Sequence, residues 1–370
     1  MVRIGIIGVG RQGGKYLKYF ERDEIQGACL TAVCDLNEDR MTELDGQGRW
    51  AHFTKYEELL RSGSVDAVII DTPHYLHPVI AAEAVRCGIS VLSDKPLGVD
   101  VRTIRKIEPE LQRSTVTFGV LFNQRMRRVF RRIKEVLERG ELGTLKRCIW
   151  EITDWYRPQK YYDLGGWRSS WRGEGGGVLI NQCVHNIDML CYLFGAPDQI
   201  QSMLGYGAYH RTVVDDSVVA NLIYPNGFVC TLISSTGETP GTNRLEISGT
   251  KGRLLFDEFN KLKFAINQIP EDVFSETATS DRYKIKFGKP KTQSFVETFE
   301  ADVDDHKACI QDFVTAVQNS GQPAADYDAG LLCAEVINGI YYSDWVGKTV
   351  SIPVDKELFY DELCSRWEKE

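Results

Sequence analysis

The sequence predicts two domains: an α/β domain with a doubly wound parallel sheet in residues 1–123, and an α+β domain with a large, mainly antiparallel open sheet in residues 124–370. Three observations support this. The first part alternates β-branched runs with helical patterns, as βαβ units do. From residue 199 onward, strand-like segments follow one another through short turns such as Pro225-Asn-Gly227. At 370 residues, the chain is long enough for two separate cores.

Composition indicates an ordinary globular protein, with 43% hydrophobic and 26% charged residues. The net charge of -8 argues against partners such as nucleic acid or an anionic membrane surface. Because no signal-peptide pattern and no membrane-spanning apolar stretch are found, we expect a cytoplasmic protein. The ten cysteines include no Cys-x-x-Cys pair, and His74 and His77 lack a nearby third ligand, so we expect no metal site.

The N-terminal strand predicted at Val2–Ile7 leads into Gly8-Val9-Gly10-Arg11-Gln12-Gly13. In a strand-turn-helix unit, the first glycine permits the tight turn, the second lets a pyrophosphate reach the backbone, and the third allows close packing of the helix. A second predicted strand, at residues 30–34, ends at Asp35, close to the spacing of about 20 residues at which a carboxylate binds a ribose 2′-hydroxyl. A carboxylate at this position favours NAD over NADP. The alternative to a cofactor site is that the glycines form an ordinary turn and Asp35 is a surface residue.

The alternation continues with a helix at 56–60, a strand at 66–71, a helix at 78–86, a strand at 90–93 and a strand at 115–122. Ligands of such sheets gather at the carboxyl ends of the strands, where Thr72, Pro73, Lys95 and Asn123 stand. Lys95 is therefore expected beside the nicotinamide, where loss of its proton would suit a general base; a surface lysine at a strand end is the alternative. His77 is expected to start a helix or to contact the cofactor.

The second part begins with a helix at 126–139, whose basic residues we interpret as a solvated face, and a strand at 144–155. A helix at 181–194 precedes strands at 199–206, 217–224, 228–235, 244–249 and 253–256. Residues 257–300 are expected to form an elaborated hairpin region, followed by helices at 304–319 and 328–346 and a short strand at 349–353. Because an open sheet leaves one face exposed, we expect pairing with another subunit in a homo-oligomer.

Two neighbouring stretches of the second part suggest a substrate pocket. Residues 154–172 are crowded with aromatic and basic side chains, which can stack on sugar rings and bind hydroxyls. From these we take Tyr156, Trp167 and Arg168 as candidate substrate contacts. The glycine-rich stretch that follows, Gly173 to Gly177, leads into a helical pattern that puts Asn181, His185 and Asp188 on one face.

With these motifs assembled, the sequence resembles the Gfo/Idh/MocA family of NAD(P)-dependent sugar and cyclitol oxidoreductases over nearly its whole length. The resemblance rests on four ordered motifs: Gly8-x-Gly10-x-x-Gly13, Thr72-Pro73-x-x-x-His77, Asp94-Lys95-Pro96, and Gly175-Gly-Gly-Val-Leu-Ile-Asn181-Gln-x-x-His185-x-x-Asp188. It implies a Rossmann domain, bound NAD and a small-molecule sugar or glycoside as substrate.

The resemblance also implies roles for single residues. Lys95 is similar to the lysine of the family's Glu-Lys-Pro motif and His185 to the histidine of its Asp-x-x-x-His pair, with Asp94 in place of the usual glutamate. Asn181 stands where inositol-type dehydrogenases carry an aspartate. An asparagine cannot take up a proton, so we assign base chemistry to Lys95 or His185 and hydroxyl binding to Asn181.

This form of the motif is similar to members that oxidise a sugar 3-hydroxyl, which predicts a sugar or glycoside 3-dehydrogenase. Glycoside cleavage through a 3-keto intermediate and inositol oxidation are alternatives within the same scaffold. An NAD- or sugar-sensing regulator without catalysis is an alternative of another class, and the presence of both Lys95 and His185 argues against it.

Overall fold

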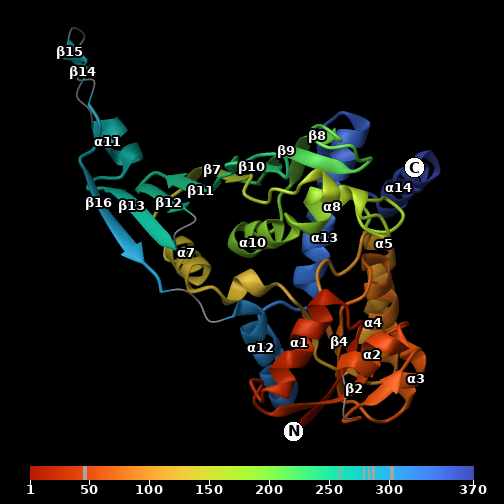
Figure 1. Cartoon of the computed structure of the whole chain (residues 1–370). Coiled ribbons are helices and arrows are strands. Elements are labelled where there is room, and N and C mark those ends of the chain that lie inside the picture. Colours follow the sequence, from red (N-terminus) through yellow and green to blue (C-terminus); the bar gives the residue numbers. More distant parts are fainter. Residues whose placement is uncertain (45–47, 258–259, 278–279, 282–283, 286–287, 301–303) are drawn as a thin grey trace.

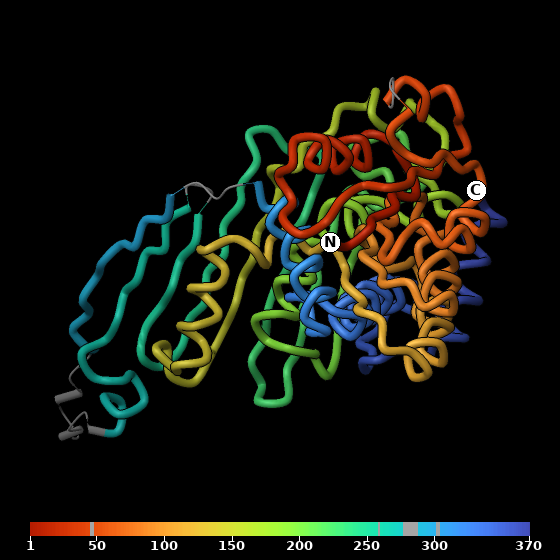
Figure 2. Tube along the Cα trace, turned by 90° about the horizontal axis from the view of Figure 1, so that it is seen from below, coloured from red at the N-terminus to blue at the C-terminus, as the bar shows by residue number. Residues whose placement is uncertain are grey.

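The computed structural model describes residues 1–370 except 45–47, 258–259, 278–279, 282–283, 286–287 and 301–303. Its two sheets lie one above the other in Figure 1, with the N-terminal sheet below and the larger sheet above. The view from below in Figure 2 shows the far strands of the larger sheet extending beyond the N-terminal domain. The predicted fold class is confirmed for both parts of the chain.

The first sheet has six parallel strands in the order β3-β2-β1-β4-β5-β6. These strands are β1 (Val2–Ile7), β2 (Ala28–Cys34), β3 (Ala51–Phe53), β4 (Ala67–Ile70), β5 (Ser90–Ser93) and β6 (Phe118–Val120). The helical elements between them are α1 (Arg11–Glu21), α2 (Glu38–Leu44), α3 (Tyr56–Arg61), η1 (His74–Leu76), α4 (His77–Arg86), α5 (Val101–Ile104), η2 (Arg105–Ile107) and α6 (Glu108–Leu111). Strand order reverses direction between β1 and β4, and such a point leaves a crevice at the carboxyl ends of the strands.

Both faces of this sheet are covered, which explains why its strands are almost continuously apolar. Ile4 and Ile6 of β1 pack in a cluster with residues of α1 and of α12 (Asp305–Asn319). Val68 and Ile70 of β4 belong to a second cluster that includes residues of α4. Helix α12 thus lies against the first sheet although it comes late in the chain, and the domain boundary at 123/124 stays a prediction.

The second sheet has nine strands in the order β16-β13-β12-β11-β7-β10-β9-β8-β17. They are β7 (Leu145–Ile152), β8 (Gln199–Tyr206), β9 (Asp215–Ile223), β10 (Val229–Ser235), β11 (Asn243–Gly249), β12 (Gly252–Asp257), β13 (Lys261–Asn267), β16 (Thr292–Thr298) and β17 (Val350–Ser351). Only the pair of β7 and β10 runs parallel, and every other pair in the sheet is antiparallel. The expected hairpin region at 257–300 contains the pair of β13 and β16, and parts of it lie outside the described residues.

The remaining elements include helices that cover the inner face of this sheet. They are η3 (Asn123–Met126), α7 (Arg128–Glu138), α8 (Gln159–Asp163), α9 (Val178–Asn181), α10 (Val184–Phe194), α11 (Glu271–Thr277), β14 (Ser280–Asp281), β15 (Lys284–Ile285), α13 (Tyr327–Val346) and α14 (Lys356–Lys369). Figure 1 shows α7, α10 and α13 between the second sheet and the first domain. The opposite face exposes apolar side chains such as Met203 and Val219, and the homo-oligomer stays a prediction.

Three local predictions differ from the structure. The strand expected at 115–122 is reduced to β6, because the chain turns back after Val120 and the Phe122 N–H donates to the Val120 carbonyl. The single helix expected at 181–194 is two helices, separated by a wider turn in which the Cys183 N–H donates to the Val178 carbonyl. Helix α14 was not expected, although Asp355 caps it and Phe359 and Leu363 bury one of its faces. Among the described residues, no helix combines the length and apolarity needed to cross a bilayer.

Candidate active site

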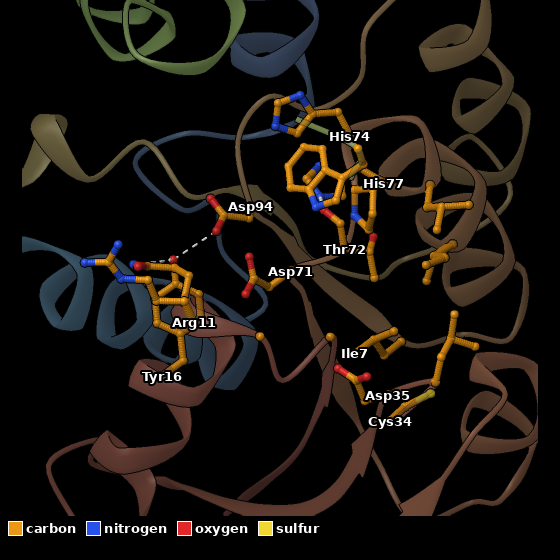
Figure 3. A pocket seen from close by; sticks show the side chains of 18 of the residues that line it. Ile7, Arg11, Tyr16, Cys34, Asp35, Asp71, Thr72, His74, His77 and Asp94 are labelled. Carbon is orange, nitrogen blue, oxygen red and sulfur yellow. Dashed lines mark hydrogen bonds between the residues drawn. The ribbon is translucent and has the colours of Figure 1, made fainter. Parts of the chain in front are cut away.

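A cavity of about 810 Å³ opens at the carboxyl ends of β1, β4 and β5, where the order of the first sheet reverses. Figure 3 shows part of its wall. The first domain supplies the larger part of the lining, and Trp167, Arg168, Asn181 and His185 close the cavity from the second part of the chain. The cavity therefore lies between the two sheets, and most of the predicted site residues meet there.

The glycine turn after β1 has the geometry that a dinucleotide phosphate needs. Gly8 has φ of +92°, and a Cβ on Gly13 would lie 2.0 Å from the Gly8 carbonyl oxygen. Around Gly10 a Cβ would meet nothing within 4 Å, so the backbone there is open to the cavity. Helix α1 starts at Arg11 after Gly10, which has no side chain to cap it. The Gly13 N–H donates to Asp71, and in the described part of the chain no hydrogen bond is found for the Arg11 and Gln12 N–H groups, which an anion can therefore use. Gly8, Gly10, Arg11 and Gln12 line the cavity, and Gly13 supports the turn from behind.

Asp35 follows β2 and lines the cavity, as the sequence predicts. Its Oδ2 accepts a hydrogen bond from the Val9 N–H at 2.9 Å, and its Oδ1 accepts one from the Asn37 N–H at 2.9 Å. The carboxylate is thus held beside the glycine turn, where a ribose would lie. Arg40 of α2 forms an ion pair with it at 3.5 Å and lines the same cavity. Sequence analysis did not assign Arg40 to the site. Its position in the first turn after Asp35 could have indicated that it lies beside that carboxylate.

Asp71 and Asp94 end β4 and β5 and form an acidic pair that sequence analysis did not assign to the site. The Asp71 carboxylate accepts a short hydrogen bond from the Gly13 N–H, while Tyr16 donates to Asp94 at 3.1 Å. Figure 3 shows the two carboxyl groups close together on the cavity wall. Burial and the nearby negative charge of Asp94 raise the pKa of Asp71 well above its ordinary value. The pair thereby joins the glycine turn to the strand that carries Lys95.

Lys95 lies directly after β5 and spans the two halves of the site. Its side-chain Nζ donates to the Asn181 carbonyl oxygen at 3.2 Å, and its backbone N–H donates to Asp94 Oδ1 at 2.7 Å. Burial lowers the pKa of Lys95, and the negative charges of Asp94 and Glu174 partly offset this effect. A lysine in this environment releases its proton more readily than one in water, which suits a general base.

His77 starts α4 and lines the cavity, but both of its ring nitrogens face backbone carbonyl oxygens. Nδ1 lies 2.7 Å from the Pro96 oxygen, and Nε2 lies 2.6 Å from the Thr72 oxygen. His77 therefore joins the segment after β4, with Thr72 and Pro73, to the segment after β5, with Lys95.

Asn181 and His185 line the cavity from the end of α9 and the start of α10. Burial lowers the pKa of His185 well below its ordinary value, and the positive charge of Lys95 adds to this effect. His185 is therefore neutral near pH 7. Its Nδ1 is buried and has no hydrogen-bond partner in the described part of the chain. Asp188, the third residue of the predicted face, points elsewhere: it is 0% exposed and pairs with Arg125 at 2.7 Å.

The aromatic stretch is divided between the cavity and the core. Trp167 and Arg168 line the cavity, and the Trp167 ring packs edge-on against His74 with centroids 5.1 Å apart. Tyr156 is not among the lining residues and is 45% exposed. Trp171 is buried against Tyr341 instead. Periodicity could not separate these roles, because the segment has little regular structure.

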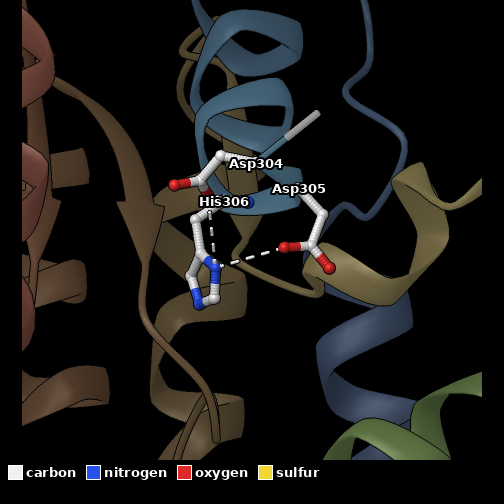
Figure 4. Close-up of side chains that lie close together, drawn as sticks. All are labelled: Asp304, Asp305 and His306. Atoms are coloured by element: carbon white, nitrogen blue, oxygen red, sulfur yellow. Dashed lines mark hydrogen bonds and ion pairs between the residues drawn. The ribbon is translucent and has the colours of Figure 1, made fainter. Parts of the chain in front are cut away.

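Two further residues, Asn123 and His306, lie near the start of α12. Asn123 is buried in η3 and is not among the residues that line the cavity, and its Oδ1 has no partner among the described residues. His306 lines the cavity, although sequence analysis did not assign it to the site. Figure 4 shows His306 between Asp304 and Asp305, and such a group has metal-ligating side chains. Asp304 is already engaged by Lys15 at 3.1 Å and by the Tyr19 hydroxyl at 2.5 Å, so we read the group as the capped start of α12.

Comparison with protein families matches both parts of the chain. Residues 2–122 match the NAD-binding Rossmann fold of the Gfo/Idh/MocA oxidoreductases, and residues 134–352 match the C-terminal alpha/beta domain of the same family. The chain belongs to the Gfo/Idh/MocA oxidoreductase family. The predicted family, the oxidoreductase class and the NAD-binding domain are thereby confirmed.

Relatives of the protein are distant in sequence but similar in fold. Myo-inositol 2-dehydrogenase of Thermotoga maritima is 27% identical over 267 residues, which cover 69% of this chain and 75% of that protein. The WlbA dehydrogenase from Bordetella pertussis, solved with NADH and UDP-GlcNAcA, superposes with a TM-score of 0.78 at 22% identity and covers 96% of this chain and 99% of that one. Levoglucosan dehydrogenase, solved with NADH and levoglucosan, has a TM-score of 0.77 at 20% identity, with 95% and 99% covered.

Proposed function

We propose that this oxidoreductase transfers a hydride between NAD and a secondary hydroxyl of a sugar or glycoside, with the 3-hydroxyl as the reacting position. The observation that carries the proposal is the meeting of Lys95, Asn181 and His185 in one cavity, with the Lys95 Nζ 3.2 Å from the Asn181 carbonyl oxygen. A base of lowered pKa, a neutral imidazole and an amide are suited to binding and deprotonating a hydroxyl. The names of the sugar dehydrogenases among the structural neighbours support the substrate class.

The residues of this chain have distinct roles in the proposed reaction. NAD, when bound, supplies the hydride acceptor. Lys95 removes the hydroxyl proton of the substrate, and the neutral His185 binds the same oxygen or a neighbouring one. Asn181 fixes a hydroxyl through its amide and does not exchange a proton. Trp167 offers a flat ring for the sugar, and Arg168 offers hydrogen bonds to its hydroxyl groups.

The choice between a sugar and an inositol rests on Asn181. The relative from Thermotoga maritima is a myo-inositol 2-dehydrogenase, which keeps inositol as an alternative substrate. In this chain, however, the position after the glycine-rich turn carries an amide that cannot act as a base. Glycoside cleavage through a 3-keto intermediate starts with the same oxidation and remains a second alternative.

The test is an assay of NADH formation with purified protein across free hexoses, glucosides and inositols, with NADP in parallel. Oxidation of hexoses or glucosides with NAD supports the proposal, and the position of the new carbonyl group is read by NMR of the product. Turnover of inositols alone contradicts the sugar assignment. Loss of the aglycone without net NADH release identifies the cleavage reaction.

A further inference from the structure

Glu174 is a carboxylate enclosed within the active-site wall that no role above uses. It lies in the glycine-rich turn before α9 and is 1% exposed. Its Oε2 accepts a hydrogen bond from the Ser169 N–H at 2.6 Å. Its Oε1 accepts a short hydrogen bond from the Asn181 side-chain Nδ2, and the Arg168 guanidinium lies 3.5 Å from the same oxygen. These three groups satisfy both oxygens of the carboxylate, as expected for a buried charged side chain that belongs to the site.

Both carboxylate oxygens of Glu174 face N–H donors, and one of them also faces a positive charge, so in this structure both oxygens act as acceptors. Burial raises the pKa of Glu174, while the Ser169 N–H and the positive charges of Arg168 and Lys95 act in the opposite direction. Ser169 has φ of +55°, a left-handed conformation that is unfavourable for a residue with a side chain. In this conformation the Ser169 N–H donates to Glu174 Oε2.

The contacts of Asn181 then determine which end of its amide faces the cavity. The Nδ2 end of the amide donates to Glu174 Oε1, and it also donates to the Tyr161 hydroxyl at 3.1 Å. Both N–H bonds of the amide are thus used within the protein. In the described part of the chain no hydrogen bond reaches the Asn181 Oδ1, and Asn181 lines the cavity. The oxygen end is therefore the one left for a ligand.

We propose that Glu174 is a positioning residue, which holds the Asn181 amide so that its oxygen accepts a hydrogen bond from a substrate hydroxyl beside the one that Lys95 deprotonates. This inference rests on the proposed function for the identity of the ligand. The inference goes beyond the proposed function because Glu174 acts on the substrate only through Asn181. It also explains how a chain with asparagine at position 181 still has a carboxylate next to Lys95: the charge comes from Glu174, seven residues earlier.

The substitution Glu174→Gln tests the inference with almost no change in shape. The introduced amide can accept from Ser169 only if its NH₂ group faces Asn181. Asn181 must then turn its oxygen inward and present its NH₂ group to the cavity. Removal of the negative charge also lowers the pKa of Lys95 further, because Glu174 is one of the charges that raise it.

The first measurement is an NMR titration of ¹³Cε-labelled lysine in the cofactor-free protein, which needs no substrate. The Lys95 signal is assigned as the one that is absent from the spectrum of Lys95→Arg. We expect Glu174→Gln to lower the Lys95 pKa. Two variants serve as controls. Glu335→Gln removes another largely buried carboxylate, which pairs with Arg105 at 2.7 Å, and should leave the pKa of Lys95 unchanged. Tyr161→Phe removes the other acceptor of Asn181 without a change in charge, and should also leave it unchanged. An unchanged Lys95 pKa in Glu174→Gln overturns the inference.

The second measurement is kinetic, with the sugar that the wild-type protein oxidises fastest. We expect Glu174→Gln to reduce kcat by about 10- to 100-fold, as for a misplaced reacting group, with a much smaller change in KM. The double variant Glu174→Gln with Asn181→Asp should recover part of kcat, because a carboxylate at 181 accepts from the introduced amide and keeps an acceptor in the cavity. Equal kcat in wild type and Glu174→Gln contradicts the inference. A wild-type protein that oxidises no sugar contradicts the proposed function alone, and the lysine titration then still decides the role of Glu174.

Discussion

The two walls of the active site are built in different ways. On the cofactor side, Gly8, Asp35, Thr72 and Lys95 lie at the ends of neighbouring parallel strands, so the sheet itself brings them together. On the substrate side, Trp167, Arg168, Asn181 and His185 come from an irregular segment and from two helices separated by a turn. Side-chain contacts such as those of Glu174 hold this wall in place. The comparison indicates that the proposed cofactor site depends on backbone geometry, whereas the proposed substrate site depends on a network of side chains.

The largest expected effect comes from Lys95, which joins the two walls. Lys95→Ala should lower kcat by about 10²- to 10⁴-fold, as expected for loss of a general base, while NAD still binds to the glycine turn. Steady-state kinetics and calorimetric NAD titration measure the two quantities separately. Retention of near-normal turnover on every accepted sugar would show that Lys95 is not the base, and His185→Ala then becomes the deciding variant.

An effect confined to the cofactor wall is expected from Asp35→Ser. The carboxylate should repel a 2′-phosphate, and Arg40 beside it becomes available to that phosphate once the carboxylate is removed. We expect the ratio of kcat/KM for NADP to that for NAD to rise by about tenfold or more, equivalent to about 1.4 kcal/mol. The KM for the sugar should not change. A wild-type protein that uses NADP alone contradicts our interpretation of Asp35.

The pH dependence of sugar oxidation separates Lys95 from His185. A base acts when unprotonated, so kcat/KM should rise as pH increases through the pKa of Lys95 in the free enzyme. Because burial lowers this pKa, the midpoint of the rise in kcat/KM should lie below about pH 10.4, the ordinary pKa of a lysine. Burial strongly lowers the pKa of His185, so this side chain should cause no change of kcat/KM above pH 7. A rise of kcat/KM that occurs at the same pH in wild type and in Lys95→Ala would show that Lys95 is not the titrating base.

The smallest effect is expected from the aromatic platform of the substrate wall. Trp167→Leu keeps an apolar side chain but removes the flat ring, and should raise the KM for the sugar by about 3- to 10-fold, corresponding to about 0.5–1.5 kcal/mol for a ring contact. Tyr156→Leu is the matched control, because Tyr156 does not line the cavity and is 45% exposed. Equal effects of the two substitutions on KM would show that the sugar does not stack on the Trp167 ring.

Much of the fold follows from local patterns. β-branched runs alternate with helical periodicity over the first 123 residues, and the strands they predict are present, although β6 is shorter than expected. Strands β8 to β12 were predicted to within a few residues because turns such as Pro225-Asn-Gly227 mark their ends, whereas β13 and β16 lie in a region expected only as an elaborated hairpin. Helix α14 was missed, since its apolar face is narrow and its signal is a single capping aspartate.

By itself, the sequence determined the glycine turn, the acidic end of β2, the strand-end lysine and the order of the two domains, because each is encoded within a few consecutive residues. Only the tertiary structure decided which polar groups share the cavity. Asp188 occupies the same predicted helix face as Asn181 but is buried against Arg125, because a turn at Gln182 and Cys183 changes the direction of the chain. Glu174 and Ser169 had no recognisable pattern at all: their importance arises from contacts between a loop and a helix, which no local periodicity encodes.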